Sequence, residues 1–141
     1  MKKLLYKPQF FFLFLAVFFL VIGLIFKDNS IDIAIYSNLV ELSVWGVCLF
    51  SMLFFVLIAI NYTSLSITLK TPKRTLTIAH IILQSVSLIP LLYFIFYSGE
   101  TRTYEQVSRM NIILILSFFI FIIATTIHLI NFMVSFLIKK E

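Results

Sequence analysis

The sequence predicts an all-α, polytopic membrane protein whose four transmembrane helices form one bundle. Of its 141 residues, 62% are hydrophobic and only 12% are charged, whereas soluble domains are about 45–50% apolar. The mean hydropathy is +1.11. The apolar residues gather into four runs, each long enough for the roughly 17–25 residues of a spanning helix. Because so short a chain cannot bury this much apolar surface in a soluble core, we expect lipid to be its solvent.

The predicted helices follow one another in a single domain covering residues 1–141. The first span is 10–26; it follows Pro8, which favours a helix start, and the absence of a small-x-small cleavage site favours an uncleaved helix over a signal peptide. The remaining spans are 39–60, 75–97 and 111–138. The last is long enough to tilt or to protrude. Helices are favoured because every backbone polar group in lipid must be satisfied within its own segment.

Lys and Arg are distributed unevenly between the predicted loops. One side carries 8 of the 11 basic residues, namely Lys2, Lys3, Lys7, Lys70, Lys73, Arg74, Lys139 and Lys140. The other side carries most of the acids. The positive-inside rule therefore predicts that both termini and the 61–74 loop are cytoplasmic. The two loops at 28–38 and 98–110 then face outward.

The order of features resembles a known family. An outer Ile31-Asp32-Ile33 stretch precedes the second helix, His80 lies near the start of the third, a Ser98-Gly99-x-x-Arg102-x-Tyr104 loop follows, and Asn111 opens the last helix. This order is similar to that of the last four of the twelve helices in subunit I of haem–copper oxidases. It is closer still to small four-helix bacterial membrane proteins related to that segment. The resemblance covers the chain from about Phe10 to Leu137.

The resemblance implies that the family's chemistry has been lost. The positions matching the two haem-ligating histidines are Val44 and Gly46, and neither side chain has a donor atom for iron. The family's metal-holding pair matches Tyr36 and Ser37, which make a poor site for a hard cation. We therefore expect no catalytic residues, no metal site and no cofactor.

The outer face carries a candidate polar cluster. Arg102 matches the first of two arginines that pair with haem propionates in the family, while the second has become Thr103. Asp32 and Glu41 complement Arg102 and Arg109 in charge. We expect the two outer loops to meet over the helix ends, with an acid in place of the propionate. The simpler interpretation of Glu41 is a solvated helix end.

Two histidines inside the predicted helices leave a haem site open as the alternative. At about 1.5 Å per residue, His80 is expected about 7 Å from the cytoplasmic surface and His128 about 15 Å. Axial ligands of one haem should lie at similar depth, so this offset argues against the pair. The simpler interpretation has His80 bonded near the inner headgroups and His128 bonded to a neighbouring helix through Thr125 or Thr126.

We therefore expect a non-catalytic integral membrane protein and not an enzyme. Its expected role is structural or accessory: packing against other membrane helices, for example in a respiratory-type complex, or self-association. The alternative is a haem-binding or electron-transfer protein that uses His80 and His128. The scarcity of intramembrane charge disfavours a transporter or channel. Expected partners are the bilayer of a bacterial inner (plasma) membrane and other membrane proteins, and the basic ends are membrane anchors, not a nucleic-acid surface.

Overall fold

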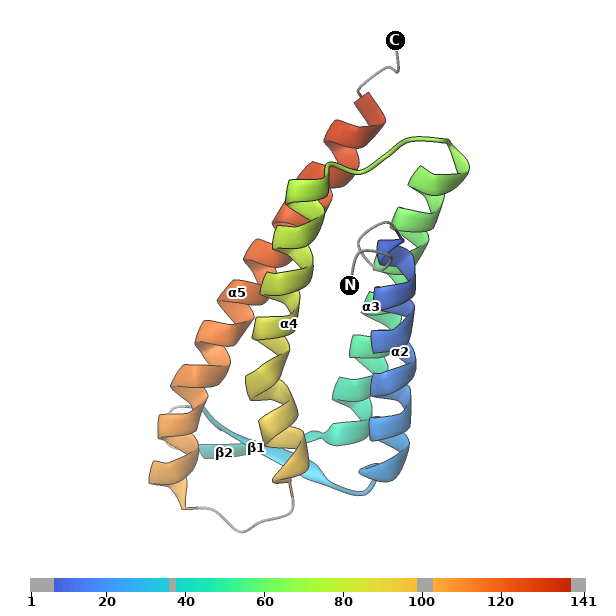
Figure 1. Ribbon diagram of the computed structural model, residues 1–141. Coiled ribbons are helices and arrows are strands. Elements are labelled where there is room, and N and C mark those ends of the chain that lie inside the picture. The colour runs from blue at the N-terminus through green and yellow to red at the C-terminus, as the bar shows by residue number, and fades with distance from the viewer. Residues whose placement is uncertain (1–6, 36–37, 99–102, 138–141) are drawn as a thin grey trace.

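The computed structural model describes residues 7–35, 38–98 and 103–137. Four helices and one two-stranded sheet follow in the order α2 (Pro8–Ile25), β1 (Ser30–Ile35), β2 (Asn38–Ser43), α3 (Val44–Ile67), α4 (Arg74–Phe96) and α5 (Tyr104–Leu137) (Figure 1). All four helices are long and apolar enough to cross a membrane. The predicted all-α, four-span fold is therefore confirmed, with a small β-hairpin as an addition.

The second helix begins later and ends later than the predicted span 39–60. Residues 39–43 pair with β1 as strand β2, and α3 begins at Val44. Ser43 stops the strand because its extended backbone and its hydroxyl, which accepts the Gly46 N–H at 3.4 Å, form an N-cap. At the other end, polar residues continue the helix as far as Ile67, and Thr63 and Ser64 donate to carbonyls one turn back in their own helix.

The last helix begins about two turns before the predicted span 111–138. α5 starts at Tyr104 and has 34 residues, a length of about 51 Å against a hydrocarbon core of about 30 Å. Asn111, expected to open this helix, lies inside it and donates to the carbonyl of Ala34 in β1 at 2.7 Å. Residues 104–110 are mostly polar, so the apolar run that predicted this helix does not include its first two turns.

The helices are arranged as two pairs. α2 packs along α3 and α4 packs along α5, whereas contact between the pairs is sparse (Figure 1). Gly23 allows the first pair to approach closely, because a Cβ there would lie 2.8 Å from Cβ of Cys48 and 3.1 Å from the Trp45 ring. Cys48 is fully buried at this contact. Cys48 therefore serves as a small packing residue between α2 and α3.

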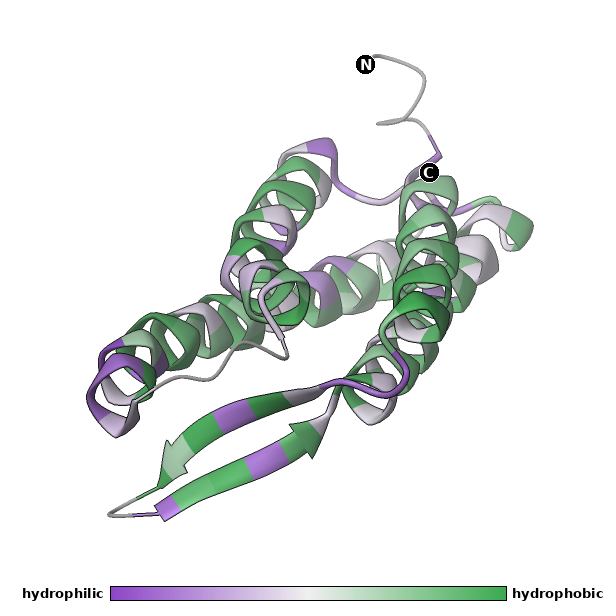
Figure 2. Cartoon of the chain, turned by 90° about the horizontal axis from the view of Figure 1, so that it is seen from below, coloured by the Kyte–Doolittle hydropathy of each residue, from purple (hydrophilic) through white to green (hydrophobic). Residues whose placement is uncertain are grey.

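The β-hairpin lies across one end of the bundle (Figure 2). Asp32 pairs with Glu41 in its antiparallel register, and Ile31 is buried against the helices. The helices in the same view are dominated by hydrophobic residues. Large apolar side chains are exposed on all four of them, as expected of a bundle surrounded by lipid.

Candidate functional site

An aromatic cluster joins the two helix pairs at the end of the bundle away from the hairpin. We call it the four-ring cluster, because each helix contributes one ring: Phe12 from α2, Tyr62 from α3, His80 from α4 and His128 from α5. None of the four side chains is more than 2% exposed. The rings of His80 and His128 stack with centroids 4.8 Å apart. The Phe12 ring lies 4.7 Å from that of His80, and the Tyr62 ring lies 4.8 Å from that of His128.

Both histidines have one hydrogen-bonded nitrogen and one without a partner. The Tyr62 hydroxyl lies 3.0 Å from Nδ1 of His80, and Nδ2 of Asn61 lies 3.3 Å from Nε2 of His128. Since an amide nitrogen can only donate, His128 carries its proton on Nδ1. Nε2 of His80, Nδ1 of His128 and Oε1 of Gln84 have no hydrogen-bond partner among the described residues. Three unpartnered buried polar atoms are unusual so close together.

A second set of polar contacts fixes α4 against α5. Oδ1 of Asn131 accepts the backbone N–H of Lys73 at 2.9 Å, and its Nδ2 donates to the hydroxyl of Thr77 at 2.9 Å. Asn131 and Thr77 are at most 1% exposed. Asn131 thus satisfies one of the free N–H groups at the start of α4 from a different helix. This contact sets the register of the two helices.

The expected difference in depth between the two histidines is wrong, because their rings are in contact. The expected depths were counted from the cytoplasmic ends of the third and fourth helices, on the assumption that both ends lie at the same depth in the membrane. In the structure, the start of α4 lies beside Asn131, and α5 continues to Leu137 beyond that point. The two rings face each other with centroids 4.8 Å apart, a separation that leaves no room for a porphyrin between them. The expected link from His128 to a neighbouring helix through Thr125 or Thr126 is also absent among the described contacts.

The hydroxyls of that turn are engaged within α5. Thr125 donates to the carbonyl of Phe121 at 2.9 Å and Thr126 to that of Ile122 at 2.9 Å. His128 reaches a neighbouring helix directly, through Asn61 of α3. Sequence reasoning had singled out both histidines but neither Asn61 nor Asn131. The available signal was the presence of isolated amides inside long apolar runs, since such residues face the interior of a membrane bundle.

The two outer loops meet, as expected, but through neutral groups. Nδ2 of Asn29 donates to the Ser98 hydroxyl at 2.9 Å and to the Ser98 carbonyl at 3.2 Å. Asn111 adds its bond to the Ala34 carbonyl at 2.7 Å. These amides tie the hairpin to both α4 and α5.

The proposed charge pairs of the outer face stay a prediction. Asp32 and Glu41 are direct neighbours across the hairpin, an arrangement in which two like charges repel and a nearby cation would be favourable. Arg109 is exposed in the second turn of α5. Arg102, with Tyr36 and Ser37, lies outside the described residues.

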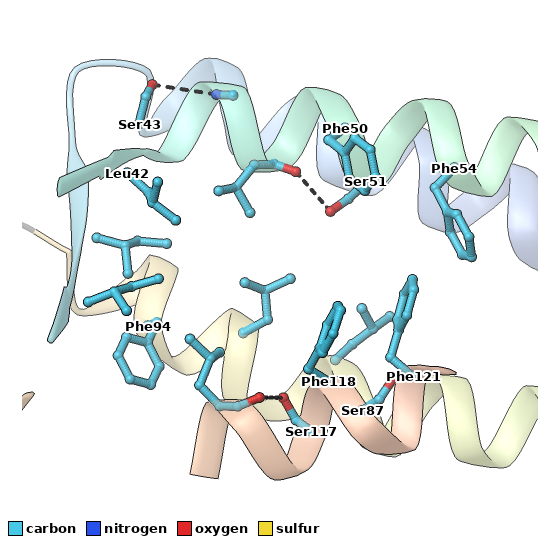
Figure 3. A pocket seen from close by; sticks show the side chains of 17 residues that line it. Leu42, Ser43, Phe50, Ser51, Phe54, Ser87, Phe94, Ser117, Phe118 and Phe121 are labelled. Atoms are coloured by element: carbon cyan, nitrogen blue, oxygen red, sulfur yellow. Dashed lines mark hydrogen bonds between the residues drawn. The ribbon is translucent and has the colours of Figure 1, made fainter. Parts of the chain in front are cut away.

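A cavity of about 530 Å³ separates α3 from α4 and α5 at the end of the bundle next to the hairpin (Figure 3). Its walls are almost entirely apolar: Ile31, Ile33, Leu42, Ser43, Gly46, Val47, Phe50, Ser51, Phe54, Ser87, Leu88, Leu91, Phe94, Leu114, Ser117, Phe118 and Phe121. Phe54 and Phe121 approach across it with ring centroids 4.7 Å apart. Gly46, a position that matches a haem ligand in the resembled family, lies in this wall. Neither histidine does.

The fold and these two features define a multi-pass membrane protein with four helices, a buried polar junction and an apolar cavity. No protein-family model, no curated protein and no solved structure matches the chain. The resemblance to oxidase subunit I therefore stays a hypothesis. Within residues 7–35, 38–98 and 103–137, no three His, Cys, Asp or Glu side chains are grouped so that they could hold a metal ion.

Proposed function

We propose that this protein is a non-catalytic integral membrane protein that packs against other membrane helices. The observation that carries the proposal is the surface of α5. Its buried stripe consists mainly of small and polar residues: Val107, Asn111, Ser117, Ala124, His128, Asn131 and Ser135. Its other faces present large apolar side chains, including Ile112, Ile115, Phe118, Phe119, Ile122, Ile123, Ile130 and Met133. The longest helix is thus also the one whose apolar span is least buried inside the bundle, which leaves much of its surface for other helices.

The four-ring cluster supports a structural role. A site for chemistry is usually a concave pocket with a few convergent polar groups. Here the polar groups of the cluster are buried within the bundle and each histidine is hydrogen-bonded to α3 through one ring nitrogen, while the cavity beside the hairpin has apolar walls. In a bundle surrounded by lipid, polar contacts of this kind hold helices together, because lipid offers no hydrophobic drive for their association. The cluster serves as the clamp between the two helix pairs.

The rival function, haem binding through His80 and His128, is supported by their unpartnered ring nitrogens. It would require the stacked rings to separate widely enough to admit a porphyrin. The packing of Phe12 and Tyr62 against the pair opposes such a movement. The clamp needs no rearrangement, and we favour it for that reason.

The face of α5 can be tested by photo-crosslinking in intact membranes. The photoreactive residue p-benzoylphenylalanine replaces Phe119, which is 58% exposed, or Phe14 of α2, a control that is 66% exposed. We expect a discrete protein adduct from position 119 and none from position 14. Self-association would give an adduct of about twice the 16.4 kDa of the chain. No adduct from position 119, or the same adduct from both positions, would contradict the proposal.

We propose that the protein lies in a bacterial inner membrane, with both termini and the α3–α4 loop in the cytoplasm. The unequal distribution of Lys and Arg supports this orientation. In a Cys48→Ala background, an impermeant thiol reagent applied to intact cells is expected to label Thr103→Cys but not Thr71→Cys. Both positions are exposed, so burial does not explain the difference. Labelling of Thr71→Cys in intact cells would reverse the orientation.

A further inference from the structure

The cavity beside the hairpin has the size of a ligand site and almost entirely apolar walls. Its volume of about 530 Å³ lies within the roughly 300–1,000 Å³ typical of ligand pockets. Three of the four serine hydroxyls in its wall donate to carbonyls of their own helix, and the fourth, Ser43, accepts the Gly46 N–H at the end near the hairpin. Ser51 donates to the Val47 carbonyl at 2.8 Å, Ser87 to that of Gln84 at 2.8 Å and Ser117 to that of Leu114 at 2.8 Å.

These walls exclude most kinds of occupant. A water molecule needs about two to four polar partners to be stable in a cavity, and these walls do not supply them. A ligand with a polar group here would lose its hydration without recovering hydrogen bonds. An empty cavity would forfeit dispersion contacts along its whole surface. Hydrocarbon is the occupant that satisfies all three conditions.

The surroundings of the cavity supply such an occupant. Its wall includes Phe50 and Phe118, which are 70% and 60% exposed and face each other from α3 and α5 (Figure 3). They lie within apolar helices long enough to span a membrane, so the cavity wall reaches the lipid-facing surface of the bundle at these two side chains. On α3 the wall extends from Gly46 to Phe54, a rise of about 12 Å along the helix axis. The site is therefore elongated along the direction in which lipid chains lie.

We propose that this cavity binds one hydrocarbon chain of a bilayer lipid, held between α3 and the α4–α5 pair. This inference does not require the proposed packing role of α5, because most of the cavity wall comes from α3, α4 and the hairpin. An acyl chain of a phospholipid and the isoprenoid tail of a membrane quinone share the required chemistry. The two sources are separated by the choice of probe.

The test is photolabelling of the full-length protein in phosphatidylcholine vesicles. One set of vesicles contains a phosphatidylcholine with a diazirine on its acyl chain, and a second contains a quinone with a diazirine on its isoprenoid tail. Leu88 and Phe94 line the cavity and are only 4% and 2% exposed, so bulk lipid does not reach them. We expect carbene adducts at these two residues, detected by peptide mass spectrometry.

A matched pair of substitutions shows whether the label enters through the cavity. Ser51→Phe fills it, while Ser64→Phe on the same helix is the control, because both hydroxyls donate to a carbonyl one turn back and Ser64 is not in the wall. We expect Ser51→Phe to lower labelling of Leu88 by about tenfold and Ser64→Phe to leave it unchanged. If Ser51→Phe does not assemble, Ser117→Leu fills the cavity from the opposite wall.

Each outcome decides the proposal. Adducts with the acyl probe support it and identify a phospholipid chain, and adducts with the quinone probe alone support it with an isoprenoid tail as the occupant. The proposal is overturned if neither probe labels Leu88 or Phe94, as would happen if protein side chains fill the space. It is also overturned if labelling is the same in the cavity-filling and control variants.

Discussion

Replacing Phe12 by alanine is expected to destabilise the protein by about 3 kcal/mol, the lower end of the range for buried Phe→Ala changes. The Phe12 ring is fully buried and stacks on Phe55, Tyr62 and His80. Its removal leaves a cavity at the junction of the helix pairs. The lower end applies because lipid, unlike water, also solvates the exposed ring when the helices separate.

Reversible unfolding in detergent measures this effect, with Phe14→Ala as the control. Phe14 lies on the same helix and is 66% exposed, so its truncation leaves no cavity. We expect the control to change the free energy of unfolding by less than about 0.5 kcal/mol. Equal losses in the two variants would show that the four-ring cluster does not hold the helix pairs together.

Replacing Asn131 by leucine is expected to cost about 1–3 kcal/mol, because it leaves buried polar groups without partners. The change removes the acceptor of the Lys73 N–H and the donor to the Thr77 hydroxyl. The start of α4 should therefore fray, and the backbone amides of its first turn should exchange hydrogen faster. The exposed Asn38 in β2 provides the control variant Asn38→Leu.

A double-mutant cycle isolates the bond between the two side chains. Asn131→Leu is combined with Thr77→Val, and the coupling energy is expected to be about 0.6–1.7 kcal/mol, between the average and the maximum found for hydrogen bonds between membrane helices. Additive effects, together with unchanged exchange at the start of α4, would show that Asn131 does not fix the register of α4 and α5.

The composition predicted the number and type of helices, because runs of apolar residues decide what crosses a membrane. It was less informative at helix ends. Residues 39–43 contain three apolar side chains next to an apolar run, which favoured adding them to the helix. From Val40 to Ser43, however, apolar and polar residues alternate as in a strand, and in the structure every residue of β2 is exposed. Residues 104–110 are mostly polar and still helical, since a helix that continues beyond its apolar span needs no continuous apolar surface.

The two histidines could be named from the sequence but not placed. Their relative depth depends on how α4 and α5 are shifted along each other, and that shift is set by Asn131 and the start of α4. A count of residues from helix ends contains no such information. The contact of the outer loops was expected from their length. Charge complementarity predicted charged partners for this contact, whereas the neutral amides of Asn29 and Asn111 form it.

The central claim is that the four-ring cluster is a structural clamp and not a cofactor site. The most direct test is the optical absorption spectrum and iron content of the protein purified from its membrane, compared with His80→Ala and His128→Ala. We expect no Soret band and no stoichiometric iron in any of the three proteins, with lower thermal stability in both variants. A Soret band with stoichiometric iron in the unchanged protein, lost in either variant, would contradict the claim.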